Sequence, residues 1–72
     1  MNGYVQFERT EQKPKTAVYL VTSSIGDVPL GQIYWINGWR RYGFHPFEET
    51  QFDASCLKEI TNFIEDLMRE RE

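Results

Sequence analysis

Apolar and polar residues alternate along the first two thirds of the chain, and this period of two predicts β-strands. The segment 16–22 is β-branched, aromatic and almost continuously apolar, which is typical of a central strand. Asn37 and Gly38 separate two further runs and favour a two-residue type I′ turn, because such a turn needs positive φ angles. We therefore expect four strands at about residues 4–9, 16–22, 30–36 and 39–44.

The last third of the chain changes to the period of a helix. Asp53 is a suitable N-cap, and Phe52 and Leu57 are spaced for a hydrophobic staple. The apolar positions that follow form one arc of roughly 140°, which predicts an amphipathic helix at about residues 54–70. These positions are Cys56, Leu57, Ile60, Phe63, Ile64, Leu67 and Met68.

Short connections make neighbouring strands antiparallel, and one amphipathic helix must cover one face of the sheet. The expected fold class is therefore α+β, with two layers: an antiparallel four-stranded meander sheet and one C-terminal helix packed on one face (β-β-β-β-α). A chain of 72 residues has room for one hydrophobic core, so we expect residues 1–72 to form a single domain.

A two-residue turn at 37 and 38 decides which hairpin residues share a face. Gln32 then lies opposite Gly43, and Arg41 stands in mid-strand, so this face is costly to bury. We expect the helix on the other face, where Gly31 makes room for the ring of Phe44. The set expected under the helix is Gly31, Ile33, Trp35, Arg40, Tyr42 and Phe44. The set expected to face away is Leu30, Gln32, Tyr34, Ile36, Trp39, Arg41 and Gly43.

Composition is typical of a folded cytoplasmic protein. Hydrophobic residues make up 40% of the chain and aromatic residues 15%, too much for a disordered segment. Cys56 is the single cysteine, which fits a reducing compartment. The start of the chain lacks the pattern of a signal peptide, and no apolar run approaches the roughly 20 residues of a membrane helix. We expect a soluble cytoplasmic protein without a membrane partner.

The charge is unevenly distributed. Residues 1–47 hold five basic and three acidic side chains, whereas residues 48–72 hold three basic and eight acidic ones. The net charge of −3 argues against general DNA binding, which depends on neutralising phosphates with Lys and Arg. The acidic segment is most simply the solvated face of the helix.

Few side chains are suited to catalysis. His45 precedes a proline at a strand end and is interpreted as a strand terminator. Cys56 falls in the first helical turn, where the dipole lowers a thiol pKa, but it also borders the apolar arc and is interpreted as structural. Glu48 and Glu49 are adjacent, so their side chains point apart. One His and one Cys cannot complete a zinc site, and no glycine-rich phosphate loop occurs. We expect no enzyme activity, metal or cofactor.

The face of the hairpin expected to point away from the helix gathers aromatic and arginine side chains. Such residues dominate the hot spots of protein interfaces. The main hypothesis is therefore a non-enzymatic module that binds a protein partner or a second copy of itself. The predicted binding residues are Tyr34, Ile36, Trp39, Arg41 and Arg40.

Three alternatives stay open. The same face suits single-stranded nucleic acid or a nucleotide, because rings stack on bases and Lys13 and Lys15 add charge. In the second alternative the acidic helix is a decoy that occupies a basic groove on a nucleic-acid-handling protein. In the third, Arg41 only stacks on Tyr34 and stabilises the hairpin. The carboxylates of the decoy hypothesis are Glu59, Glu65, Asp66 and Glu70.

One string of residues resembles a known group of proteins. It reads Leu-Gly-x-Ile-x-Trp from Leu30 and Trp-Arg-x-Tyr-x-Phe-x-Pro from Trp39, followed by a helix with Cys-Leu-x-x-Ile-x-x-Phe-Ile from Cys56. The pattern covers roughly residues 28–68 and is similar to small uncharacterised bacterial and phage or prophage proteins. The resemblance implies a phage-related setting and no particular activity.

Overall fold

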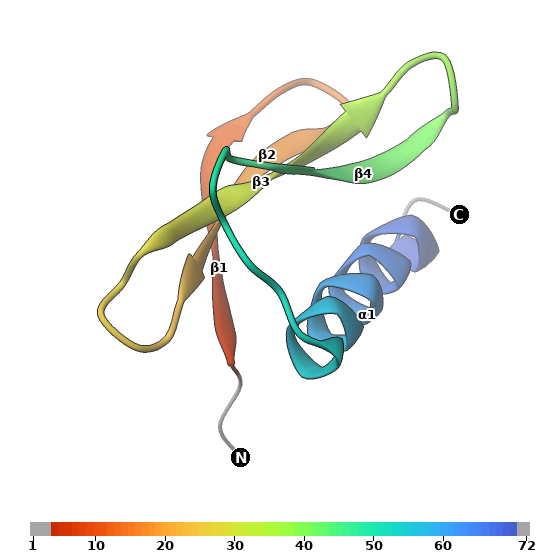
Figure 1. Cartoon of the computed structure of the whole chain (residues 1–72). Helices are drawn as coiled ribbons and strands as arrows, with labels where there is room; N and C mark the ends of the chain where they lie inside the picture. The colour runs from red at the N-terminus through yellow and green to blue at the C-terminus, as the bar shows by residue number, and fades with distance from the viewer. Residues whose placement is uncertain (1–3, 71–72) are drawn as a thin grey trace.

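The computed structural model describes residues 4–70, which form one antiparallel sheet and one helix (Figure 1). The sheet has the order β1-β2-β3-β4, so each strand pairs with its neighbour in sequence. This confirms the α+β meander with a C-terminal helix on one face. The elements are β1 (Val5–Gln12), β2 (Ala17–Ser23), β3 (Pro29–Ile36), β4 (Arg41–Pro46) and α1 (Ala54–Glu70).

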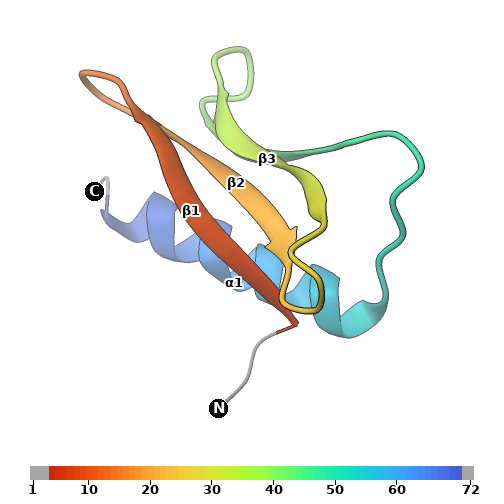
Figure 2. The ribbon, with the colours of Figure 1, turned by 90° about the vertical axis from the view of Figure 1, so that its left-hand side faces the viewer.

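The core lies between the sheet and α1, which crosses one face of the sheet (Figure 2). Val21 and Ile33 are completely buried at its centre, and Ile60 from the helix is 3% exposed. The Phe63 ring stacks on Phe7 of β1 at a centroid distance of 4.0 Å. Burying these side chains supplies most of the stability, at about 1.5–3 kcal/mol for each fully buried aliphatic side chain.

The helix begins after a side-chain cap. Asp53 Oδ1 accepts a hydrogen bond of 2.9 Å from the backbone N–H of Cys56, which satisfies one of the free donors of the first turn. The Phe52 ring packs edge to face on Phe44 of β4, at 5.2 Å between centroids, while Leu57 is 46% exposed. The predicted N-cap is therefore present, and Phe52 packs against the sheet.

The β3–β4 turn corrects the predicted two-residue turn. Residues 37–40 form a four-residue turn, and the left-handed residue is Arg40 (φ 58°), whereas Gly26 is the only positive-φ glycine in residues 4–70. The pairing shifts by two, so Trp35 lies opposite Tyr42, and their rings meet edge to face at 5.4 Å. The physical reason is burial: the predicted register would have placed Arg40 opposite Trp35 on the core side.

A shift of two leaves most side chains on the face predicted for them, because the period of a strand is two. Three positions are corrected, the first being Trp39, which leaves the strand predicted from residue 39 and becomes a turn residue. Arg40 leaves the buried set and becomes a turn residue. Leu30, expected to face away, is 8% exposed in the core, because a bulge inserts it between the pairs that Pro29 and Gly31 make with β2.

The end of β4 also differs from the prediction. The strand continues through His45 and Pro46, and Pro46 lies opposite Gly31. Because β4 is an edge strand, its proline is tolerated. A Cβ at Gly31 would lie 2.6 Å from the carbonyl oxygen of His45 and 2.8 Å from the Phe44 ring. The glycine is thus required by the ring, as expected, and equally by the neighbouring backbone.

Candidate binding surface

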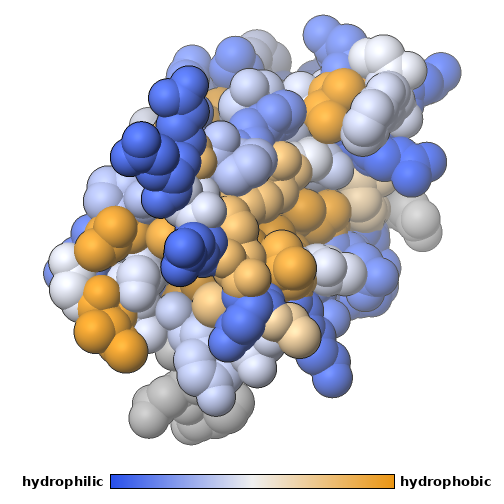
Figure 3. Space-filling view, in the orientation of Figure 1, coloured by the Kyte–Doolittle hydropathy of each residue, from blue (hydrophilic) through white to orange (hydrophobic). Residues whose placement is uncertain are grey.

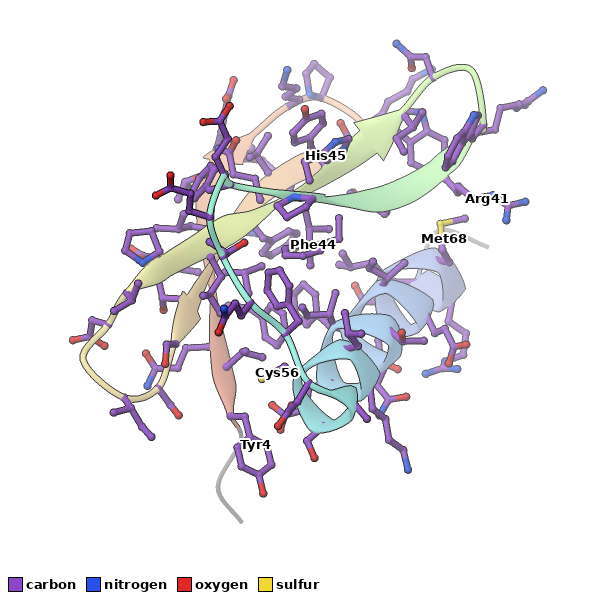
Figure 4. The ribbon with its side chains drawn as sticks, viewed as in Figure 1. Tyr4, Arg41, Phe44, His45, Cys56 and Met68 are labelled. Carbon is purple, nitrogen blue, oxygen red and sulfur yellow. The ribbon has the colours of Figure 1, made fainter. Side chains whose placement is uncertain are left out.

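The candidate surface lies on the sheet face that points away from α1, here called the outer face. Its central position on β3 is Tyr34, 37% exposed, with Ile36 next along the strand. His45 contributes from β4, and Figure 4 shows His45 and Phe44 directed to opposite sides of that strand. Arg41 starts the same edge strand but lines a hollow with residues of α1, and Figure 4 shows it beside Met68. The outer face therefore keeps Tyr34 and Ile36, as their parity predicts, but not Trp39, which lies in the β3–β4 turn.

Tyr34 does not meet the predicted partner. Its ring stacks on the His45 imidazole, with centroids 3.6 Å apart and planes inclined by 5°. Arg41 lies opposite Ile36 instead of Tyr34, so the expected Arg41–Tyr34 pairing across the strands is wrong. Gly43, which lies opposite Tyr34, has no side chain, and the Ile36 Cδ1 methyl occupies the space that a Cβ at Gly43 would need.

His45 is the residue of the candidate surface that the sequence analysis does not include. It was interpreted as a strand terminator, but it is a half-buried strand residue whose Nε2 has no hydrogen-bond partner within residues 4–70. The available signal was parity: His45 lies two residues beyond Gly43 and so shares its face. Because a proline follows His45, the sequence predicts that the strand ends at residue 44, whereas β4 continues to Pro46.

Trp39 and Arg40 sit on the tip of the β3–β4 turn. Trp39 is 68% exposed, and its backbone N–H donates to the Ile36 carbonyl at 3.1 Å. The Arg40 N–H donates to the same carbonyl at 2.8 Å. These bonds hold Arg40 in the left-handed conformation, which is uncommon for a residue with a Cβ. The turn thus presents a large ring and two guanidinium groups, those of Arg40 and Arg41, from a closed loop.

An open groove of about 640 Å³ lies beside this tip, between the β1–β2 and β3–β4 turns. It brings Lys13 and Lys15 to the same hollow as Tyr34, although they are far apart in the sequence. Trp39, Arg40 and Arg41 do not line it, so the predicted surface has two parts, the turn tip and the groove. The groove residues are Glu11, Lys13, Pro14, Lys15, Thr16, Val18, Gln32, Tyr34, Trp35 and Asn37.

The side chains considered for catalysis are not brought together. Cys56 lies at the start of α1, and burial, together with the nearby Asp53 side chain, raises the pKa of its thiol. His45 is on the outer face of the sheet, away from the helix (Figure 4). Within the described residues, no three His, Cys, Asp or Glu side chains are grouped so that they could hold a metal ion.

The helix carboxylates of the decoy hypothesis are partly engaged inside the molecule. The Glu59 carboxylate accepts hydrogen bonds from the backbone N–H of Tyr4, at 2.8 and 3.0 Å, and from that of Val5 at 3.3 Å. Asp66 forms an ion pair with Arg69 one turn later. Glu59 therefore holds the start of β1 against α1. Its carboxylate is then less available to a basic groove on another protein.

The sequence is similar to that of a phage protein. It is 35% identical over 69 residues, 94% of this chain and 88% of the relative, to an uncharacterised 9.3 kDa protein of Acholeplasma phage L2. No protein-family model and no solved structure matches the chain. No helix within residues 4–70 is long and apolar enough to cross a bilayer. At this identity and coverage, the chain belongs to the same family of small phage proteins as the 9.3 kDa protein of Acholeplasma phage L2.

Proposed function

We propose that this phage-related protein is a non-enzymatic module that binds a protein partner through its tip surface. The tip surface comprises the turn residues Trp39 and Arg40, the adjoining strand residues Ile36 and Arg41, and Tyr34 at the border with the groove. The observation that supports it most directly is Trp39, which is 68% exposed on a tight turn although a chain this small has few large side chains to stabilise its core.

The chemistry of the tip surface suits a protein interface. Trp, Tyr and Arg are the side chains that most often carry binding energy when they are enclosed by a partner. The hydrogen bonds from Trp39 and Arg40 to the Ile36 carbonyl fix the turn before binding. A loop that is already ordered loses less conformational entropy on association, so more of the contact energy appears as affinity.

The proposal is tested by affinity capture from phage-infected host cells with three forms of the protein. These are the wild type, a W39A/R40A/R41A variant, and a control variant, E65A/D66A, altered on the exposed face of α1. We expect the wild type and the control to retain the same partner and the tip variant to lose it. Retention of that partner by the tip variant would exclude the tip surface.

A second candidate function is supported by the groove. Lys13 and Lys15 stand on one side of it and Tyr34 on another, which combines phosphate-binding cations with a ring on which a base can stack. Single-stranded nucleic acid or a nucleotide fits this arrangement. Binding of a short oligothymidylate should then weaken steeply as salt rises, because bound counterions are released from the phosphates. A K13A/K15A variant should lose that salt dependence, and a flat titration of the wild type removes this candidate.

A further inference from the structure

The two ends of the sheet carry opposite charge. The β1–β2 turn (13–16) and the β3–β4 turn with the first residue of β4 (37–41) lie at one end, and together hold Lys13, Lys15, Arg40 and Arg41 with no acidic residue. The β2–β3 turn (24–28) and the segment after β4 (47–51) lie at the other end, with three acidic residues and no basic one. We call these the basic end and the acidic end. Their formal charges are +4 and −3.

Each end also exposes large apolar side chains. Trp39 projects from the basic end. At the acidic end Ile25 is 82% exposed, Val28 52% and Phe47 40%. Hydrophobic atoms are visible around the β2–β3 turn in the space-filling view, at the side where that turn lies in Figure 1 (Figure 3). Apolar side chains bordered by charge of one sign are typical of surfaces that other proteins cover.

The acidic end has a well-defined shape. The Ser23 N–H donates to the Val28 carbonyl at 2.8 Å and closes the β2–β3 turn, in which Gly26 and Asp27 both have positive φ. The Phe47 N–H donates to the Leu30 carbonyl at 2.9 Å and holds the segment after β4 against β3. Both loops are therefore fixed to the sheet, as the basic turns are.

We propose that the occupant of the acidic end is the basic end of a second copy of this chain, so that copies associate head to tail. The inference rests on the proposed function, because it uses the tip surface and assigns a second copy as its partner. Trp39 would then lie against Ile25, Val28 and Phe47, while the cations around it meet the acidic side chains. Those acidic side chains are Asp27, Glu48 and Glu49.

Charge decides the orientation of this contact. A two-fold interface between identical ends would place four cations against four cations, or three carboxylates against three carboxylates. In a head-to-tail contact the four loop cations of one copy approach the three loop carboxylates of the next. The long axis of the molecule measures 32 Å, which exceeds the Debye length of about 10 Å at 0.1 M salt, so the two ends of one copy do not neutralise each other. A head-to-tail contact does not close on itself in a dimer and builds chains or rings.

The test uses one variant blocked at each end. W39A/R40E/R41E blocks the basic end. I25K/V28K blocks the acidic end, because it replaces the exposed apolar side chains of the β2–β3 turn with lysine. Each is followed by sedimentation velocity alone and in an equimolar mixture. We expect the wild type to form species larger than a dimer as concentration rises and to dissociate at high salt. Each variant alone should be a monomer, and the mixture should form a 1:1 dimer and nothing larger, because each variant keeps the end that the other lacks.

Several outcomes overturn the inference. A wild type that stays monomeric at high concentration excludes it, and so does a pair of variants that fail to combine although circular dichroism shows both folded. If the basic-end variant does not fold, K13E/K15E blocks the same end from the other turn. The proposed function fails separately: a monomeric wild type that still captures a host or phage protein through its tip leaves that function intact and removes only self-association.

Discussion

Tyr34 and His45 form a parallel stack on the outer face of the sheet, with ring centroids 3.6 Å apart. The residue directly opposite Tyr34 is Gly43, so His45 reaches the ring diagonally from the next outward position of β4. The stack covers one side of the Tyr34 ring and leaves the residue 37% exposed toward the groove. The stack therefore fixes the orientation of the tyrosine ring at the border of the groove.

We predict that His45→Ala lowers the free energy of unfolding by about 0.5–1.5 kcal/mol, the range for an aromatic pair. His45→Phe is the matched control, since it keeps a flat ring and removes the buried Nε2 atom that has no partner in the described part of the chain. The phenylalanine variant should be at least as stable as the wild type in urea unfolding. Equal losses in both variants would show that the stacked ring contributes nothing.

The hairpin shows what the sequence predicts and where the prediction ends. The alternation of side chains identified the buried Ile33 and Tyr42 and the partly buried Phe44, because parity survives a shift by two residues. The Asn37–Gly38 pair indicated a turn at the right place but of the wrong length. The local preference of Asn-Gly for a two-residue turn is outweighed, because a longer turn brings Trp35 against Tyr42 in the core.

The candidate site was predictable in composition and less so in geometry. Tyr34 and Ile36 lie on the outer face, as expected from their spacing, whereas Arg41 at the start of edge strand β4 lines a hollow with residues of α1. The groove could not be found from sequence, because it needs Lys13 and Lys15 of one turn placed beside residues of β3, a contact set by the packing of three strands. Leu30 likewise depends on a β-bulge, which leaves no pattern in the chain.

Two glycines of the hairpin should respond differently to a methyl group. At Gly31 an added Cβ would meet the His45 carbonyl oxygen at 2.6 Å, and backbone cannot move aside cheaply. We expect Gly31→Ala to cost about 1–3 kcal/mol of stability. At Gly38 nothing lies within 4 Å, so Gly38→Ala should be neutral or slightly stabilising. Thermal unfolding of both variants checks this contrast, and similar melting temperatures would contradict it.

The bond between Glu59 and the start of β1 should contribute measurably to stability. Removing the carboxylate in Glu59→Ala leaves the N–H groups of Tyr4 and Val5 without this acceptor, and we expect a loss of about 1–3 kcal/mol. Hydrogen exchange of those two amides should accelerate in the variant. Glu65→Ala, altered on an exposed position of the same helix, is the control and should leave their exchange rates unchanged. Unaltered protection in Glu59→Ala would rule out the anchor.

Asp53 should make stability depend on pH. Hydrogen bonds from the Cys56 backbone N–H and side chain hold the pKa of this carboxyl below its ordinary value of 3.8. A group whose pKa is lowered on folding stabilises the fold above its unfolded pKa, and that contribution disappears as pH falls through the folded pKa. In urea unfolding, the wild type should therefore exceed Asp53→Ala at pH 7, with the gap closing below pH 3.8. Asp53→Asn keeps a capping side chain without a charge, so its difference in stability from Asp53→Ala should not change with pH. A difference between the wild type and Asp53→Ala that stays constant with pH would contradict the prediction.

The Cys56 thiol should be unreactive in the folded protein. Burial raises its pKa above the ordinary value of 9.0, and the neighbouring Asp53 side chain acts in the same direction. This direction is opposite to the lowering that a helix dipole gives the pKa of a thiol in a first turn. Because the thiolate is the nucleophile, the folded protein at neutral pH should react with a disulfide reagent more slowly than the protein unfolded in urea. Faster reaction in the folded state would mark Cys56 as an activated nucleophile and contradict a non-enzymatic module.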